Sequence, residues 1–183
     1  RDAVSGIRAP ARHWTRLDPL AFDSAGDSKV TWELNRHQWI VTLAQAHALT
    51  GEHHYARTIV ATLNDWDRAN PYGIGLNWPS SLEVAYRLIA WCWGLVLVRD
   101  AGVLPPAALG DVLSLVWTHA RHVERYLSHY FSPNTHLTGE ALGLFYAGVL
   151  FPEFGAARRW RDVGARILID EARRQIFDDG VYF

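Results

Sequence analysis

The sequence predicts an all-α fold of helical hairpins arranged as an incomplete (α/α) toroid. Apolar residues recur at helical spacing in six stretches, and no long alternating pattern typical of a β-strand occurs. The stretches pair into three hairpins whose first members begin near residues 32, 80 and 134, a repeat of roughly 50 residues. Each hairpin joins an apolar helix to an amphipathic one, so hairpins stacked side by side bury the apolar helices and form an arc.

Composition is that of an ordinary globular domain. Of 183 residues, 49% are hydrophobic and 20% are charged, which supports one substantial core. Residues 1–30 carry prolines, glycines and charges without a sustained period, so we expect an irregular N-terminal arm there and the toroid domain over 31–183. The net charge of -1 gives no basis for nucleic-acid binding.

Several sequence features limit the setting of the chain. No run of about 20 apolar residues occurs, so no membrane span is predicted, and the first residues lack the pattern of a secretion signal. The absence of methionine indicates a processed or excised piece of a longer chain. Cys92, the only cysteine, lies between two tryptophans in an apolar run, so we predict a core thiol and no internal disulfide.

The first hairpin is predicted over residues 31–50 and 52–67. One face of its first helix is apolar, and Thr50 and Gly51 supply a terminator. The first turns carry polar residues, namely Glu33, Asn35, Arg36 and His37. The second helix has an apolar stripe and is predicted to be an outer, half-exposed helix.

The second hairpin follows a loop over residues 70–78 that contains proline and two glycines. Ser80 and Glu83 form a capping box for a helix over 81–99 that is apolar nearly all round. Its partner over 107–130 is amphipathic and carries His119 and His122 one turn apart. Because no third ligand accompanies them, we interpret both as surface histidines and predict no metal and no cofactor.

The third hairpin begins at Ser132, where Ser132 can cap a helix and Pro133 suits its first turn. Gly139, Gly143 and Ala147 form a stripe of small residues four apart, which lets another helix approach closely. An arginine-rich amphipathic helix over residues 158–176 completes the hairpin.

Polar clusters stand at the start of all three inner helices. If consecutive hairpins run parallel, these clusters share a rim where helix N-termini favour a carboxylate or sulfate. Fork-shaped guanidinium groups suit carboxylates, and indole rings can stack on a sugar. The residues expected to shape this rim are Asn35, Arg36, Asn77, Trp78, Glu83 and Arg87, with Trp32 as a further ring.

His136 is the best titratable candidate, because its imidazole can take a proton near neutral pH. The Asn134 amide, two residues earlier, can hydrogen-bond a carboxylate and so make the neighbouring C–H proton removable. Structural roles stand as the alternative, with Asn134 capping the helix. Glu33 and Glu83 can be an acid/base pair of an inverting glycosidase or can form salt bridges with arginines, Arg87 lying one turn beyond Glu83.

Three motifs in this order resemble the helical N-terminal domain of the heparinase II/III-like polysaccharide lyases: WELNRHQ (32–38), NWPSSLEVAYR (77–87) and SPNTHLTGEALG (132–143). The resemblance implies an incomplete toroid followed by a C-terminal β-sandwich that this chain lacks, with an acidic polysaccharide between the two domains. It also favours a periplasmic or secreted bacterial protein.

By the same resemblance, His136 matches the family's histidine that acts on the uronic acid. Asn134 or Thr135 matches the family's asparagine that neutralises the carboxylate. Relatives often place asparagine directly before the histidine, where this chain has Thr135. The family's catalytic tyrosine lies just beyond the segment that ends here, and Tyr182 is not assigned its role. We therefore predict the helical part of a lyase, inactive or very weak alone; a toroid hydrolase and a non-catalytic carbohydrate-binding scaffold are the alternatives.

Overall fold

The computed structural model describes residues 2–102, 106–130 and 132–182 and is almost entirely helical. Its elements are η1 (Trp14–Arg16), α1 (Phe22–Ala25), α2 (Ser28–Asn35), α3 (Trp39–Thr50), α4 (His53–Ala69), α5 (Ser81–Val98), η2 (Arg99–Ala101), α6 (Pro106–Arg125), α7 (Thr135–Leu150) and α8 (Ala157–Gln175). Within the described residues, extended backbone segments pair at two isolated β-bridges and form no named strand. The predicted all-α class is confirmed.

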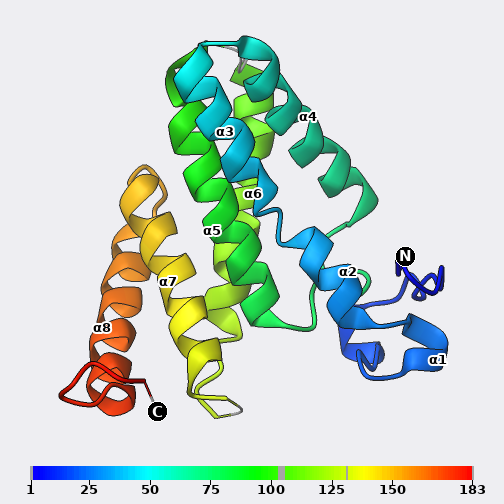
Figure 1. Cartoon of the computed structure of the whole chain (residues 1–183), viewed down its shortest axis with the longest axis vertical. Helices are drawn as coiled ribbons and strands as arrows, with labels where there is room; N and C mark the ends of the chain where they lie inside the picture. Colours follow the sequence, from blue (N-terminus) through cyan, green and yellow to red (C-terminus); the bar gives the residue numbers. More distant parts are fainter. Residues whose placement is uncertain (1, 103–105, 131, 183) are drawn as a thin grey trace.

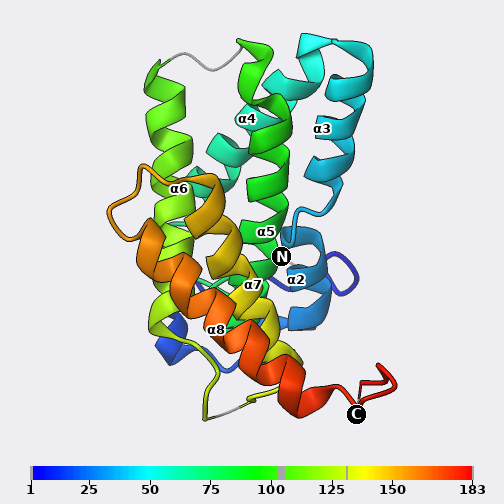
Figure 2. The same cartoon turned by 90° about the vertical axis from the view of Figure 1, so that its left-hand side faces the viewer.

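The three predicted hairpins are present as α3–α4, α5–α6 and α7–α8 (Figure 1). Helix α5 packs against both α3 and α7, so these three form the inner layer. Helix α8 covers α7 on the outside, and α6 lies beside α5 (Figure 2). The hairpins therefore stack side by side as the repeat predicted.

The small-residue stripe of α7 lets α5 approach closely, as predicted. A Cβ on Gly139 would lie 2.5 Å from Leu82 Cδ1, and one on Gly143 would lie 3.2 Å from the Cβ of Ala85. The contacts advance in the same direction along both helices, so α5 and α7 are parallel. Their N-termini consequently lie at the same end of the molecule (Figure 1).

The first inner helix was predicted as one unit over residues 31–50, and this is wrong. The helix breaks between Asn35 and Trp39, where His37 adopts a left-handed conformation with φ 56°. His37 is 5% exposed, and its Nδ1 accepts a hydrogen bond from the Trp91 indole at 3.0 Å. Burial of this ring against α5 favours the break over helical continuity, and no glycine or proline marks it in the sequence.

Aromatic side chains dominate the main core. The rings of Trp66 and Trp91 lie 5.4 Å apart in an edge-on arrangement, and Trp78 lies 6.0 Å from Trp66. Cys92 is fully buried, which confirms the predicted core thiol, and burial raises its pKa. Helix α5 extended to Ala101 is long and apolar enough to cross a membrane, but 72% of that window is buried against the other helices, as in the core helix of a globular domain.

Candidate functional site

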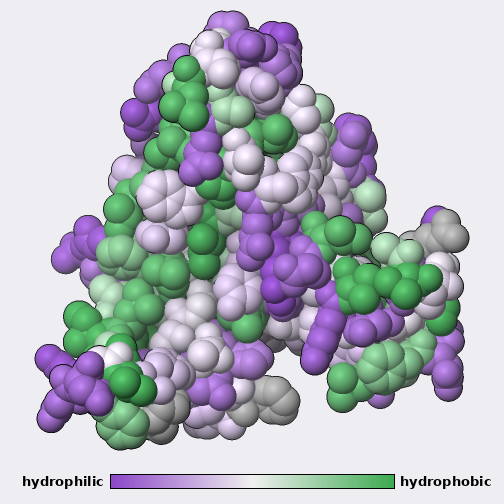
Figure 3. All heavy atoms as spheres, viewed as in Figure 1, coloured by the Kyte–Doolittle hydropathy of each residue, from purple (hydrophilic) through white to green (hydrophobic). Residues whose placement is uncertain are grey.

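A polar rim forms where the first turns of α5 and α7 come together. Arg36, directly after α2, donates from Nε to Glu83 Oε2 at 2.7 Å and from Nη2 to Glu83 Oε1 at 2.8 Å. Leu82, the neighbour of Glu83, packs on Gly139 of α7, one turn beyond His136. The rim thus joins the break after α2 to the starts of two inner helices, and hydrophilic surface gathers around that break (Figure 3).

The charge of Arg36 is offset within the rim. Its Nη1 donates to Glu33 at 2.6 Å, so two carboxylates flank one guanidinium. The hydrogen bond to Glu83 raises the pKa of Arg36, and the guanidinium also lies 5.0 Å over the Tyr86 ring. Two N–H groups of the five remain for a ligand. Arg36 therefore orders the rim, and Glu33 and Glu83 offset its charge; its contact with an anionic ligand stays a prediction.

The start of α7 carries the second part of the site. Asn134 is the N-cap residue: its Oδ1 accepts a hydrogen bond from the backbone N–H of His136 at 3.2 Å. Ser132, which we expected to cap the helix, instead donates its hydroxyl to the same oxygen at 3.2 Å. Asn134 and Thr135 are exposed, and His136 is half-buried.

These contacts fix the orientation of the Asn134 amide. A backbone N–H can only donate, so the atom that Asn134 turns toward His136 is its oxygen. His136 Nδ1 lies 3.2 Å from that oxygen and 3.3 Å from the Ser132 hydroxyl oxygen. The Asn134 NH2 group makes no hydrogen bond to any described residue and points away from the cap.

Arg87 and Trp78, expected on the rim, lie in the core instead. Arg87 is 0% exposed and Trp78 is 1% exposed, so neither side chain can contact a substrate. Arg87 does not form the expected ion pair with Glu83; it donates to His119 Nε2 at 3.1 Å and to the carbonyl oxygens of Asn77 at 2.9 Å and Asn35 at 3.3 Å. The Arg87 guanidinium carbon lies 4.5 Å from the centroid of the Trp66 ring, so an aromatic face takes the place of water around the buried charge.

Trp32, the further ring expected on the rim, is half-buried, and its indole N–H donates to the carbonyl oxygen of Leu76 at 2.6 Å. Asn35 is half-buried and Asn77 is buried, and both amides join a hydrogen-bonded group behind the rim. The predicted residues are thus divided: Arg36, Asn134, Thr135 and His136 stand at the rim or the α7 start. Glu83, which we expected to contact the substrate, is buried at 4% exposure with both oxygens paired to Arg36, and it supports the rim from within together with the others.

The surface position predicted for His119 and His122 is wrong. The two rings are 0% and 1% exposed, because both face the tryptophan core from α6. Burial, followed by the charge of Arg87, lowers the pKa of His122 to about 4 and the pKa of His119 well below its ordinary value. Both rings are therefore neutral at physiological pH. Among the described residues, no group of three His, Cys, Asp or Glu side chains is placed to hold a metal ion.

Two buried groups that sequence reasoning missed hold the start of α7 in place. Glu140 is 0% exposed and accepts from the backbone N–H and the hydroxyl of Ser128, both at 2.7 Å. Gln175, at the end of α8, donates to the carbonyl oxygen of Pro133 at 3.4 Å and accepts from the Tyr182 hydroxyl. The E in the SPNTHLTGEALG motif was the available signal, because a carboxylate on a buried stripe requires a partner.

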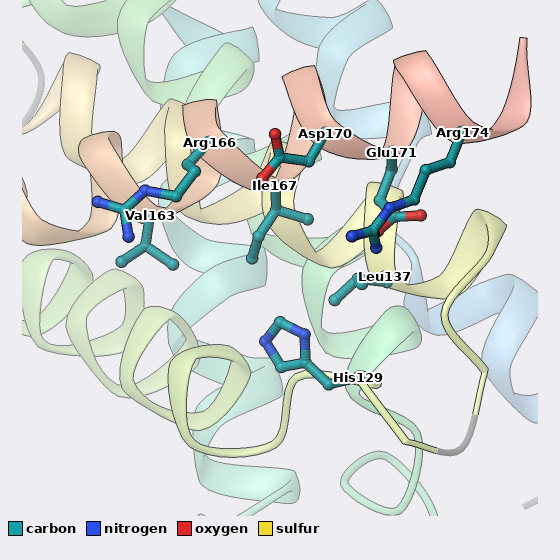
Figure 4. A pocket seen from close by; sticks show the side chains of 8 residues that line it. All are labelled: His129, Leu137, Val163, Arg166, Ile167, Asp170, Glu171 and Arg174. Atoms are coloured by element: carbon teal, nitrogen blue, oxygen red, sulfur yellow. The ribbon is translucent and has the colours of Figure 1, made fainter.

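A cavity of about 320 Å³ lies on the side of α7 that faces α8. Figure 4 shows His129 facing Arg174 across an apolar floor that includes Leu137. Arg174 is paired with Glu171 at 2.9 Å, and Arg166 stands beside Asp170 on the same helix. Positive and negative side chains balance on this wall, so the cavity offers an anionic sugar no net attraction.

An arc of helical hairpins in which the inner helices α5 and α7 start at one polar rim defines the helical domain of an (α/α)-toroid protein. Residues 12–183 match the family described as heparinase II/III N-terminus. The chain belongs to this family.

Relatives and solved structures agree with this assignment. The heparin-sulfate lyase of Pedobacter heparinus is 32% identical over 162 residues, which cover 86% of this chain and 24% of the relative. That of Bacteroides thetaiotaomicron is 30% identical over 151 residues, which cover 81% of this chain and 21% of the relative. The crystal structure of heparan sulfate lyase HepC from Pedobacter heparinus aligns with a TM-score of 0.75 at 29% identity, covering 93% of this chain and 26% of that one. The chain thus spans about a quarter of the length of these relatives.

Proposed function

We propose that this chain is the helical domain of a polysaccharide lyase that cleaves a uronic-acid-containing polysaccharide by β-elimination. The similarity to heparin-sulfate lyases supports this class of reaction, and their greater length supports a further domain, the C-terminal β-sandwich, as the partner that completes the site. The observation that carries the proposal is the geometry at the start of α7, where the His136 imidazole stands beside an unpaired Asn134 amide.

The chemistry requires two groups at one uronate residue. The Asn134 NH2 group donates to the uronate carboxylate, and the partial positive charge of the α7 N-terminus favours the negative charge that develops there. His136 Nε2 takes the proton from C5, beside that carboxylate. The electron pair forms the C4–C5 double bond as the C4–O bond breaks, and the departing oxygen receives a proton. No water is consumed, and one product carries an unsaturated uronate.

The remaining roles in the proposal follow from position. Arg36 and Glu83 fix the rim beside α7, with Thr135 next to the reacting residue, and Asn35, Asn77, Trp78 and Arg87 hold the rim from within. We infer from the family resemblance that the catalytic tyrosine lies beyond residue 183. We therefore expect the isolated 183-residue chain to be inactive or very weak.

A hydrolase on the same fold would need a carboxylate pair with access to water. Both Glu83 oxygens accept from Arg36, and the side chain is 6% exposed, so Glu83 is poorly placed as a general acid or base. This leaves Glu33 without a partner carboxylate and disfavours the inverting-glycosidase alternative. Hydrolysis would also give reducing ends without unsaturation.

The proposal is tested on the full-length protein with a panel of uronate polymers, by following the ultraviolet absorbance of unsaturated ends. Asn134→Ser and Asn134→Asp separate the two roles of this residue, because both side chains cap a helix but neither carries an amide N–H. Asn134→Asp also places a negative charge beside the substrate carboxylate. We expect wild-type thermal stability with turnover reduced at least a hundredfold in both variants.

Thr58→Val serves as the control and should retain turnover, because this exposed hydroxyl donates only to the His54 carbonyl oxygen of α4, away from the site. Wild-type rates in Asn134→Ser and His136→Ala would reduce both residues to structural roles. No unsaturated product from any polymer, with folded full-length protein, would refute the lyase itself.

A further inference from the structure

Gln175, the last residue of α8, is a buried amide on which three segments of the chain converge. Helices α7 and α8 run antiparallel, so the end of α8 lies beside the start of α7 (Figure 2). The side chain is 5% exposed, and its Nε2 donates to the Pro133 carbonyl oxygen at 3.4 Å and to Glu171 Oε2 at 2.6 Å. Its Oε1 accepts a hydrogen bond from the Tyr182 hydroxyl. Both N–H groups and the oxygen of this amide are therefore occupied.

The partners of Gln175 allow only one orientation of its amide. The Pro133 carbonyl oxygen can only accept, so the NH2 group of Gln175 must face α7. Glu171, one turn earlier on α8 and 4% exposed, takes the second N–H while its other oxygen accepts from Arg174 at 2.9 Å. A flipped amide would turn its oxygen toward two acceptors and leave the Tyr182 hydroxyl without one.

The turn after α8 brings Tyr182 back to this amide. The backbone N–H of Phe177 donates to the carbonyl oxygen of Val181 at 2.8 Å, and Ile176 pairs with Tyr182 in an isolated antiparallel bridge. The Tyr182 ring is 46% exposed, so the turn holds the hydroxyl against Gln175 from the solvent side. Gln175 is thus held from two sides while it contacts the loop before α7.

The contact with Pro133 reaches the proposed reacting groups through the backbone. A peptide unit is planar, so a hydrogen bond to the Pro133 carbonyl oxygen also fixes the N–H of Asn134. That N–H donates to the Ser132 carbonyl oxygen at 2.8 Å, and the Asn134 side chain caps the N–H of His136. Rotation of this one peptide plane would therefore move both the Asn134 amide and the His136 imidazole.

We infer that Gln175 is a positioning residue for the proposed elimination: it holds the peptide between Pro133 and Asn134, and so aims the Asn134 amide and the His136 imidazole at the uronate. Gln175 is buried and acts on the substrate only through these two residues. The inference rests on the proposed function for the reaction whose groups are aimed. Misplacement of reacting groups by about 1 Å can cost about a hundredfold in rate, so the turnover number kcat should respond more than KM.

Gln175→Glu in the full-length protein tests this role, because it keeps the shape of the side chain and the acceptor for Tyr182 but removes the amide donors. We expect kcat on uronate polymers to fall about ten- to hundredfold with KM changed by less than about threefold. Hydrogen exchange should become faster at the backbone amides of His136 and Thr138, which bond to Asn134 in the first turn of α7. Gln45→Glu, the same change on the exposed face of α3, should alter neither measurement.

Exchanging the two side chains, as Glu171→Gln with Gln175→Glu, separates positioning from stability. The amide introduced at position 171 can donate to the carboxylate introduced at position 175, and Tyr182 keeps its acceptor, but the Pro133 carbonyl oxygen has no donor. Thermal stability should return toward the wild-type value while kcat stays low.

Recovery of kcat together with stability in the exchanged variant, or a wild-type kcat in folded Gln175→Glu, would overturn the positioning role. Failure of the proposed function looks different, because the wild-type protein would then give no unsaturated product from any polymer. Hydrogen exchange at His136 does not depend on turnover, and unchanged exchange in Gln175→Glu would sink the inference in that case as well.

Discussion

Replacing Arg87 with methionine tests whether a buried cation organises this domain. The guanidinium donates to His119 Nε2 and to the carbonyl oxygens of Asn35 and Asn77, and across the described ranges it forms no ion pair. Methionine fills a similar volume but leaves three buried acceptors without donors, at about 1–3 kcal/mol each. Removing the desolvated charge offsets part of this cost. Three unpaired acceptors, less the desolvation recovered with the charge, lead us to expect a net loss of about 3–5 kcal/mol for Arg87→Met.

The assay is thermal unfolding of the helical domain within the full-length protein. Roughly 2–4 °C per kcal/mol applies to a domain of this size, so the midpoint should fall by roughly 6–20 °C. Burial lowers the pKa of Arg87 to about 9, which leaves it charged at neutral pH. Arg87→Lys keeps a cation, but a single ammonium cannot span three acceptors, and an intermediate loss is expected.

Arg68→Met is the matched control, because its side chain is 73% exposed and its pair with Asp65 is a surface salt bridge. Its effect should stay within about 0.5 kcal/mol. A loss below about 1 kcal/mol in Arg87→Met would show that the neighbouring acceptors find water or rearrange, and would refute the organising role of Arg87.

Three further predictions follow from burial and packing. His122 has a folded-state pKa of about 4, below its ordinary value of 6.5, so on acidification the unfolded state takes up a proton on this ring before the folded state does. Stability is therefore lost as pH falls from 6.5 to 4, at up to about 1.4 kcal/mol per pH unit. In denaturation experiments between pH 7.5 and 5, His122→Gln should flatten this slope, and His54→Gln on the surface should not. A Cβ on Gly148 would lie 2.5 Å from the α8 backbone, so Gly148→Ala should destabilise the fold by about 1–3 kcal/mol. A Cβ on Gly110 would have nothing within 4 Å, so Gly110→Ala should be neutral or slightly stabilising. Equal effects of the two substitutions in urea denaturation would contradict this packing. Glu140→Gln replaces an acceptor of two hydrogen bonds with an amide, so hydrogen exchange should become faster before α7 and turnover should fall; unchanged exchange would rule out an anchoring role.

Periodicity was enough to predict the hairpins, and small residues were enough to predict close helix contact. Helical spacing identifies the apolar stripes of α5 and α7 directly. The spacing of Gly139 and Gly143 predicts that another helix packs closely against that face of α7. The Ser80 cap of α5 also follows from local sequence: its hydroxyl accepts from the Glu83 backbone N–H at 3.4 Å. These features depend on contacts between residues close in sequence or on one helix face.

The break at His37 and the burial of Arg87 could not be predicted in this way. Each depends on partners 32–54 residues away, as in the Arg87–His119 and His37–Trp91 hydrogen bonds. A pattern based on hydropathy treats arginine and histidine as surface residues, because it does not include the acceptors and aromatic rings that the fold brings to them.

Arg87 also explains why polar motifs in this chain include both binding and structural residues. It binds the carbonyl oxygens of Asn35 and Asn77, the residues directly before Arg36 and Trp78, and so ties the break after α2 to the loop before α5. Arg36 can then meet Glu83 across that junction. A polar cluster at an inner-helix start is therefore not by itself a ligand site; the side chains that remain available are those whose donors or acceptors the junction leaves unused. By this criterion the Asn134 amide and the His136 imidazole face the proposed reacting uronate.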